Sequence, residues 1–266
     1  MSARLSVLQV LRRPALLALA PAVFLAGCTQ MKIDMGMRML IAKLPVNSIE
    51  VHLAKSQGVA PGQNAPLVVT FAGSNGQSWA TEGAGRGAIM WEDLTITPTI
   101  VAYNNDGTLS LPVDPRLSDG KTGHVVVTLA FNPNLRAETD VPVRYDVKYY
   151  AEFNGGDRLS AYAPSVTVRL VMRPGEGKLI EAAVQPTAGK ERFYLIDPNG
   201  GSLSVSADGG CIGRGCPGCY DCRLGRGGAI TVIYDPAVAP YLNVLQLSSL
   251  GGPEPVFTSQ HLDPLW

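Results

Sequence analysis

Residues 143–153, VRYDVKYYAEF, decide the fold class because apolar and polar residues alternate along them. One face of this segment would carry Val143, Tyr145, Val147, Tyr149, Ala151 and Phe153, and the other Arg144, Asp146, Lys148, Tyr150 and Glu152. A period of two residues is typical of a half-buried β-strand, whereas a helical period of about 3.6 would scatter the apolar residues around the surface. We therefore predict a strand.

The same alternation recurs in the residues before and after this segment. Residues 124–132 should turn Val125, Val127, Leu129 and Phe131 inward, and residues 164–173 should do so with Val166, Val168, Leu170 and Met172. Weaker strand patterns cover 48–54, 65–73, 94–103 and 108–113, with turn sequences between them. About seven strands without a long helical pattern predict an antiparallel, immunoglobulin-like β-sandwich over 48–185.

Residues 186–266 are predicted to form a smaller β-rich unit, rich in Gly and Cys. Its strands are expected at 193–196, 202–207, 229–234 and 244–248. Asp235 followed by Pro236 is a typical helix start, which predicts one short helix over 236–242. The expected fold class is thus all-β, a sandwich followed by this smaller unit.

The first 27 residues have the pattern of an export signal. Arg4, Arg12 and Arg13 precede the apolar stretch 15–27, which is shorter than the roughly 20 residues that span a membrane. The stretch ends in Leu-Ala-Gly-Cys at 25–28, which resembles the lipobox of bacterial lipoproteins. We therefore expect a lipoprotein signal peptide over 1–27 and a tether over 28–47. An ordinary secretory signal with a chance Cys is the alternative.

This resemblance implies that the Cys28 thiol receives a diacylglycerol and that the leader is cut before it. The new amino group would then be acylated, commonly with palmitate. The resemblance also implies sorting to the outer membrane, because Thr29 follows the Cys in place of Asp. Several acyl chains would anchor the protein firmly to the membrane without spanning it. Whether the protein then faces the periplasm or the cell exterior stays open.

Charge and motifs exclude several function classes. The chain has 22 basic and 22 acidic residues, and from Cys28 onward 19 basic residues stand against 22 acidic ones. A weakly acidic chain without a basic stripe is not expected to bind nucleic acid. No catalytic, nucleotide-binding or metal-binding motif appears. His52, His124 and His261 lie far apart in the sequence, and we expect them to be surface or edge residues. We therefore predict no enzyme activity and no cofactor.

One group of closely spaced residues in the sequence has side chains that could form disulfides or bind a metal, namely the four cysteines Cys211, Cys216, Cys219 and Cys222. An exported protein meets an oxidising compartment, where closely spaced cysteines favour two disulfides. The pairing 211–222 with 216–219 and the pairing 211–216 with 219–222 both remain open. Four thiolates could instead bind zinc or an iron–sulfur cluster, or exchange disulfides.

The second unit also resembles a class of glycine-rich bacterial surface proteins whose role is undefined. The likeness lies in GGSLSVSADGG, GRGGAITVIYDPAVAPYL and LQLSSLGG, about 60 residues in all. This chain departs from the long glycine-rich inserts of that class, because its first insert is short and contains the four Cys.

These features predict a lipid-anchored outer-membrane or cell-surface β-protein with a structural, adhesive or assembly role. Its partners would be the membrane, through the anchor, and other envelope or surface proteins. The alternative is a metal-binding or redox-active envelope lipoprotein that uses the four-Cys loop. A third possibility is a carbohydrate-binding or carbohydrate-hydrolysing module, for which Trp79, Trp91, Tyr150 and Tyr162 could form a sugar platform or could equally be core or edge residues.

Overall fold

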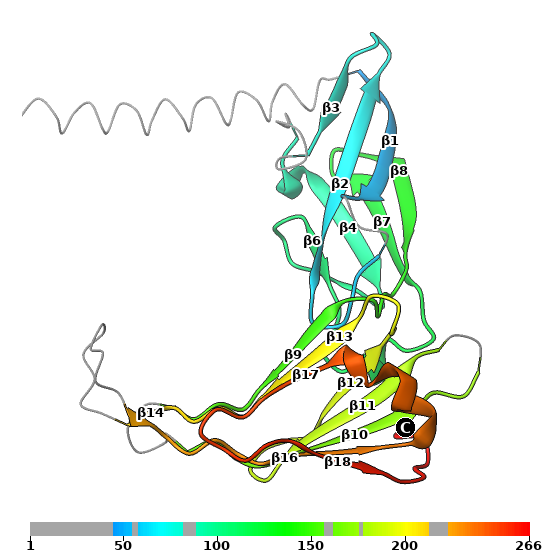
Figure 1. Cartoon of the computed structure of the whole chain (residues 1–266). Helices are drawn as coiled ribbons and strands as arrows, with labels where there is room; N and C mark the ends of the chain where they lie inside the picture. Colours follow the sequence, from blue (N-terminus) through cyan, green and yellow to red (C-terminus); the bar gives the residue numbers. More distant parts are fainter. Residues whose placement is uncertain (1–44, 55–57, 82–88, 157–161, 176–177, 213–222) are drawn as a thin grey trace, which may run out of the picture. The chain divides into compact units, whose positions relative to one another are not determined.

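The computed structural model describes residues 45–54, 58–81, 89–156, 162–175, 178–212 and 223–266 (Figure 1). Regular structure in these residues is almost entirely β-strand, so the predicted all-β fold class is confirmed. The helices in this part of the chain are three short 3₁₀ helices, η1 (Trp91–Asp93), η2 (Pro115–Leu117) and η4 (Pro236–Val244). The predicted signal peptide, Cys28 and most of the tether lie outside the described residues.

Contacts divide the chain into two compact units. The first contains the described residues up to Val51 together with 68–95 and 127–137, and the second contains 52–67, 96–126 and 138–266. The division cuts through several strands, so single strands contribute to both units.

Two sheets contain the strands that precede residue 142. One has the order β1-β2-β6-β5, with β3 paired to β2, and the other has the order β4-β7-β8. The strands are β1 (Val46–Leu53), β2 (Asn64–Gly73), β3 (Ser78–Ala80), β4 (Leu94–Thr99), β5 (Ala102–Tyr103), β6 (Thr108–Ser110), β7 (Gly123–Leu129) and β8 (Asn132–Val141). The pairs β2–β3, β2–β6 and β5–β6 are antiparallel.

The inward residues predicted for β7 are correct with one exception. Val125, Val127 and Leu129 are buried, at 0, 0 and 2% exposure. Phe131 was predicted to face inward, and this is wrong, because β7 ends at Leu129 and Phe131 is 41% exposed in the turn that follows. The strand predicted over 94–103 is divided into β4 and β5 at Ile100, whose φ of 69° interrupts the extended backbone.

The strands after residue 147 form two further sheets. Their orders are β17-β13-β9 and β12-β11-β10-β16-β18. The strands are β9 (Lys148–Glu152), β10 (Val166–Met172), β11 (Ile180–Pro186), β12 (Arg192–Ile196), β13 (Ser202–Ser206), β16 (Ile230–Tyr234), β17 (Leu245–Ser248) and β18 (Val256–Ser259). The domain boundary expected after residue 185 falls at the end of β11, which pairs with β12.

Pairing in these sheets is mixed, not purely antiparallel. β10–β11 and β11–β12 are antiparallel, but β9–β13, β13–β17, β10–β16 and β16–β18 are parallel. Parallel neighbours cannot be joined by a hairpin and require a long connection. The chain accordingly passes through β10, β11 and β12 between β9 and β13.

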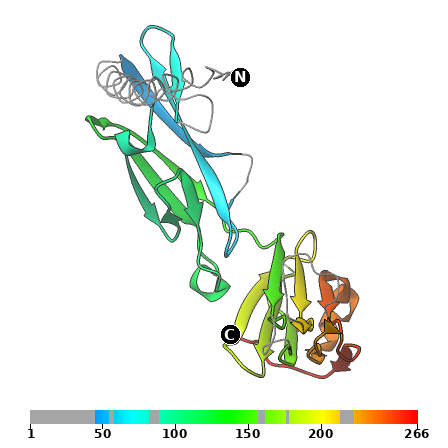
Figure 2. The same cartoon turned by 90° about the vertical axis from the view of Figure 1, so that its left-hand side faces the viewer.

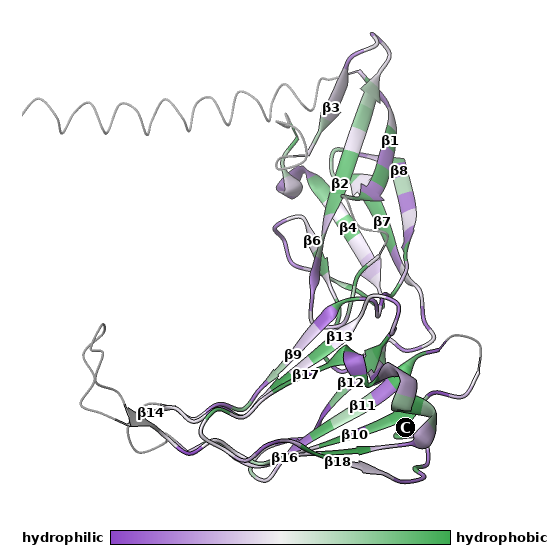
Figure 3. Cartoon of the chain, viewed as in Figure 1, coloured by the Kyte–Doolittle hydropathy of each residue, from purple (hydrophilic) through white to green (hydrophobic). Residues whose placement is uncertain are grey.

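The two sheets lie face to face and share one core (Figure 1, Figure 2). β9 and β13 contribute Tyr149, Ala151, Leu203 and Val205 to this core. The opposite sheet contributes Val166, Val168, Leu170, Ile180, Ala182, Val184, Tyr194, Ile196, Ile230 and Val232, and Figure 3 shows the hydrophobic stretches of β10 and β11 in green. The alternation predicted over 143–153 is therefore confirmed for its second half, whereas regular pairing begins only at Lys148.

The outer face of the five-stranded sheet is covered by residues 260–266. Glu181 on β11 is only 2% exposed, and its Oε2 accepts a hydrogen bond from the Leu265 N–H at 2.8 Å. The ring of Phe193 on β12 packs edge-on against Trp266, with 5.7 Å between the centroids. β11 is thus buried on both faces, and its sequence, IEAAVQP, lacks the alternation that sequence patterns detect.

The short helix predicted over 236–242 is present as η4. The Asp235 side chain accepts a hydrogen bond from the Ala237 N–H at 3.0 Å, and Pro236 occupies the first turn. The helix is 3₁₀, and Pro240 inside it has no N–H to donate to an α-helical ladder. In the part of the chain that the structure describes, no helix is long and apolar enough to cross a membrane.

Candidate functional site

The described end of the cysteine loop is a short two-stranded stem. β14 (Cys211–Ile212) pairs antiparallel with β15 (Arg223–Leu224), so that Cys211 faces Leu224 and Ile212 faces Arg223. This pairing brings the two ends of the loop 213–222 together. Cys216, Cys219 and Cys222 lie in that loop, outside the described residues, and their predicted disulfides remain a prediction.

The stem leads into the sheets through 207–210 and 225–229. Five segments lie together here, namely 153–156, 162–165, 207–212, 223–229 and the turn-containing segment 249–253, and we call them the glycine arm. Figure 1 shows extended traces running alongside one another from the sheets to β14. Backbone hydrogen bonds join them: Gly155 N to Asp208 O (2.8 Å), Gly209 N to Leu250 O (2.8 Å), Gly225 N to Gly210 O (2.6 Å), Gly228 N to Ala207 O (2.8 Å) and Ala163 N to Arg226 O (3.1 Å).

The segment 207–212 therefore bonds to three neighbours, namely 153–156, 223–229 and 249–253. A strand in a flat sheet has at most two. Facing sheets normally lie about 10 Å apart because side chains fill the space between them. Here β13 and β16 continue into segments that bond directly to each other, so the gap between the two sheets closes. The glycine arm is a backbone bundle, not a sheet.

Glycine is required in the arm because its backbones touch. A Cβ on Gly210 would overlap the carbonyl oxygen of Gly156, and a Cβ on Gly228 would overlap that of Pro164. At Gly227 the carbonyl oxygen of Leu250 would be 2.5 Å away, closer than real Cβ contacts. Any side chain at these positions would force the segments apart.

Asp208 holds three segments of the arm together. Its Oδ1 accepts hydrogen bonds from Ser248 Oγ (2.6 Å) and from the Leu250 N–H (2.7 Å), and Ser206 Oγ lies 3.0 Å from its Oδ2. Its own N–H donates to Asn154 Oδ1 at 3.0 Å, and Ser206 also bonds to Asn154. Burial acts to raise the pKa of Asp208, but the hydrogen bonds from Ser248, Leu250 and Ser206 outweigh it and hold this pKa below its ordinary value.

No sequence pattern predicted this network. Its residues are dispersed over four segments, and none belongs to a known motif. The available signal was the position of Asp208 between a strand and a Gly-Gly pair, because a short polar side chain there can accept backbone N–H groups from a neighbouring segment.

The three histidines lie on different elements. His52 is exposed on β1, and His261 follows β18 with its Nδ1 3.0 Å from Asp235 Oδ2. His124 on β7 has its Nδ1 2.9 Å from Asp140 Oδ1 and its Nε2 3.7 Å from Glu138 Oε2. The hydrogen bond to Asp140, with the charge of Glu138, raises the pKa of His124.

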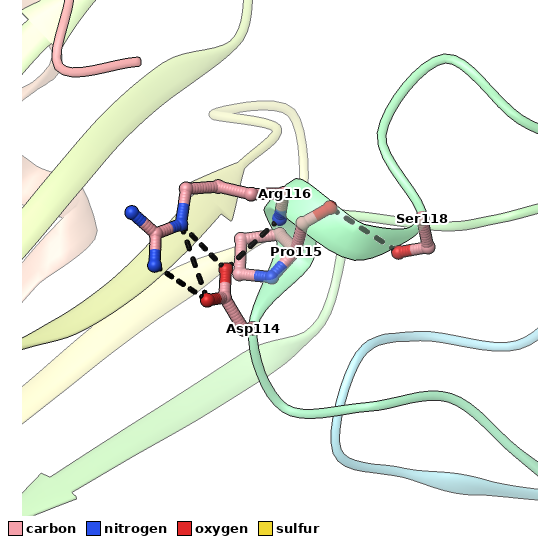
Figure 4. Close-up of polar contacts among 4 residues, drawn as sticks. All are labelled: Asp114, Pro115, Arg116 and Ser118. Atoms are coloured by element: carbon pink, nitrogen blue, oxygen red, sulfur yellow. Dashed lines mark hydrogen bonds and ion pairs between the residues drawn. The ribbon is translucent and has the colours of Figure 1, made fainter.

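Two aspartates in turns, Asp114 and Asp119, form ion pairs. Asp114 caps η2 by accepting the Arg116 N–H at 3.1 Å, and it also binds the Arg116 guanidinium at 2.7 Å (Figure 4). Asp119 pairs with Arg173 at 2.5 Å, which lowers the pKa of the carboxyl group. These carboxylates stabilise turns and contacts, and within the described ranges no group of three or more His, Cys, Asp or Glu could hold a metal ion.

The four aromatic residues considered as a platform do not share one environment. Trp91 is 7% exposed and belongs to the core, and Trp79 is half-buried on β3. Tyr150 on β9 and Tyr162 in the glycine arm are 63% and 66% exposed.

A comparison of the chain with protein-family models finds no match, and a comparison with curated proteins finds none either.

Proposed function

We propose that the chain is a lipid-anchored outer-membrane or cell-surface protein with a structural, adhesive or assembly role, and that it is not an enzyme. The observation that carries the proposal is the glycine arm. Its segments are held by backbone hydrogen bonds and by the Asp208 network, and they end in the β14–β15 stem. A bundle of this kind suits a rigid support for the loop 213–222.

The packing of the arm supports a mechanical role over a catalytic one. Its interior consists of glycine backbones, whose N–H and C=O groups are already bonded to each other. Such an interior leaves few side chains with which to bind or activate a substrate. Two disulfides in the loop would cross-link the end of this support. They would stabilise it, because a cross-link restricts the conformations of the unfolded chain.

The Leu-Ala-Gly-Cys sequence at 25–28 supports the membrane anchor. Each buried CH₂ of an acyl chain contributes about 0.8 kcal/mol, so several chains on Cys28 hold a protein on a membrane persistently. The segment 28–47 would link this anchor to β1, which begins at Val46.

Fractionation of the two membranes tests the location, with Thr29 as the variable. We expect the wild-type chain in the outer-membrane fraction, Thr29→Asp in the inner-membrane fraction, and the control Thr29→Ser in the outer membrane. Recovery of the wild-type protein in a soluble fraction, or no difference between Thr29→Asp and Thr29→Ser, would contradict the proposed sorting.

A further inference from the structure

The five-stranded sheet ends on one side in β18, which pairs with β16 and, within the described residues, with no strand beyond it (Figure 1). All four residues of β18 are exposed, including Val256 at 58% and Phe257 at 49%. Natural proteins protect an unpaired strand edge with charged side chains, bulges or covering segments, because such an edge readily pairs with another strand. β18 has no charged residue, and its register with β16 is regular over all four residues.

Other edges of the two facing sheets are protected in these ways. At the opposite edge of the same sheet, the ring of Phe193 on β12 is covered by the Arg116 guanidinium, 3.6 Å from its centroid, and by Trp266. At one edge of the three-stranded sheet, β9 begins with Lys148 and ends with Glu152, and both are exposed. β18 differs from these edges because it combines exposed apolar side chains with an uncharged, uncovered backbone.

The backbone groups of β18 that face away from the sheet belong to Phe257 and Ser259. The Gln260 N–H donates to the Tyr234 carbonyl oxygen at 3.0 Å, so Gln260 bonds toward β16. Successive residues of a strand bond in opposite directions, so the N–H and C=O groups of Phe257 and Ser259 point outward. An added strand would give these groups partners, as in other cases of recognition by strand addition.

The side chain of Phe257 stands at the edge of the apolar core. Its register neighbour on β16 is Val232, which is fully buried in that core. Neighbouring residues on paired strands point to the same face of a sheet, so Phe257 lies on the core-facing side and leaves half of its surface exposed. An apolar side chain from an added strand would extend the core across this edge.

The edge is complementary to a second copy of itself. In an antiparallel pair, two residues that both bond across the gap stand directly opposite each other. Phe257 opposite Phe257 of a second copy meets this condition, and Val256 then stands opposite Thr258. Aromatic pairs stabilise a sheet, and no like charges are brought together.

We propose that two copies of the chain pair antiparallel through β18, about a two-fold axis at Phe257. Pro255 has no N–H to donate, so the ladder between the copies ends there. A stable interface buries about 800 Å² on each partner, and a ladder of about five residues covers less, so the two copies should separate readily in solution.

This inference goes beyond the proposed function and does not depend on the lipid anchor, because β18 lies on a folded sheet. Its failure would leave the anchor and the glycine arm untouched, and failure of the anchor would leave the pairing through β18 untouched.

Oxidative cross-linking of the full chain, purified in detergent, tests the proposal. Opposite residues that bond to each other have Cα atoms about 5.5 Å apart, a distance that a disulfide spans. We therefore expect Phe257→Cys to give several times more disulfide-linked dimer than the wild type, whose own cysteines set the background. Ser259→Cys is the matched control, because its two copies would lie about 14 Å apart along the strands and should stay at the wild-type level.

Sedimentation equilibrium provides a second measurement that needs no added cysteine. The dimer fraction of the wild type should rise with protein concentration. Phe257→Lys should abolish the dimer, because two like charges would stand opposite each other, whereas Val256→Lys, which faces Thr258, should keep more of it.

Three results would overturn the proposal: no dimer of Phe257→Cys above the wild-type level, equal yields for Phe257→Cys and Ser259→Cys, or equal dimer fractions in the wild type and Phe257→Lys. Cross-linking of Phe257→Cys to a different envelope protein, without the self-linked dimer, would overturn it as well.

Discussion

Gly209 faces the carbonyl oxygen of Gly225 so closely that one methyl group on Gly209 would overlap it. The next residue, Gly210, accepts the N–H of Gly225 at 2.6 Å. These contacts join the continuation of β13 to the segment that leads into β16, so strands of two facing sheets meet without side chains between them. The integrity of the glycine arm therefore depends on residues that have no side chain.

Gly228→Ala should destabilise this arm. The added methyl group would overlap the carbonyl oxygen of Pro164, and overpacking of a close contact costs about 1–3 kcal/mol. The free energy of unfolding in urea and the rate of proteolysis within 209–228 measure the effect. Leu250→Ala is the control, because Leu250 is 61% exposed in the same arm, and a surface truncation should change stability by less than about 0.5 kcal/mol. Equal stability of Gly228→Ala and the wild type would contradict the backbone contact.

Asp208→Ala should loosen the arm in the same proteolysis assay. The change leaves the Leu250 N–H and the Ser248 hydroxyl without their acceptor, and a lost partner in a partly buried site costs about 1–3 kcal/mol. Asp106→Ala is a matched control, because Asp106 accepts its hydrogen bonds from Thr108 within a single exposed turn. If both variants had the same effect, the Asp208 network would not hold the segments together.

Acid should weaken the network in the wild-type protein. The pKa of Asp208 is lower in the folded chain than in the unfolded chain, so its stabilising contribution is present above the unfolded pKa of about 3.9. This contribution is lost as the pH falls through the folded pKa. Proteolysis of the arm with an acid-active protease should therefore accelerate below about pH 4 in the wild type and much less in Asp208→Asn. Identical pH profiles would contradict this assignment.

The contribution of His124 to stability should depend on pH in the opposite direction. Its pKa is raised in the folded chain by Asp140 and Glu138, so its contribution to stability is present below the unfolded pKa of about 6.5. It is lost as the pH rises through the folded pKa. An NMR titration of the His124 imidazole should give a lower pKa in Asp140→Asn than in the wild type, and an unchanged titration would disprove the contact.

The cysteine loop separates the structural proposal from the alternative of a metal-binding or redox-active protein. With two disulfides, the mature protein should have no free thiol, no bound metal and a mass about 4 Da below the reduced form, because each bridge removes two hydrogens. Stoichiometric zinc or iron with reactive thiols after chelation would favour the metal alternative. Reduction at a mild potential would favour disulfide exchange.

Strands could be predicted from the sequence where one face of the strand is buried and the other is exposed to solvent. β7 and β10 fit this description, and the predicted inward residues Val127 and Val168 are fully buried. β11 was not predicted because both of its faces are covered, and β8 was not predicted because its polar sequence, NPNLRAETDV, is exposed along most of its length. The alternation on which the prediction depends is absent in β11. β8 has it over 135–141, where Arg136, Glu138 and Asp140 are exposed, but the small or polar residues Ala137 and Thr139 on the other face make the pattern weak.

Strand pairing and the glycine arm could not be predicted for a different reason. Turn sequences indicate hairpins between neighbours in the chain, but β9 pairs with β13, about 50 residues further along. The Gly-Gly pairs at 209–210 and 227–228 indicated loops. Their packing depends on Gly156 and Pro164, which lie far away in the sequence. Such contacts exist only after the two sheets have come together.

Cys28 provides the most direct test of the lipid anchor on which the proposed function depends. Cells that express the wild-type chain, Cys28→Ser or the control Cys211→Ser are grown with labelled palmitate, and the proteins are partitioned between detergent and water. The account predicts label and detergent partitioning for the wild type and for Cys211→Ser, and an unlabelled, uncleaved precursor for Cys28→Ser. Palmitate incorporation and normal membrane fractionation of Cys28→Ser would contradict it.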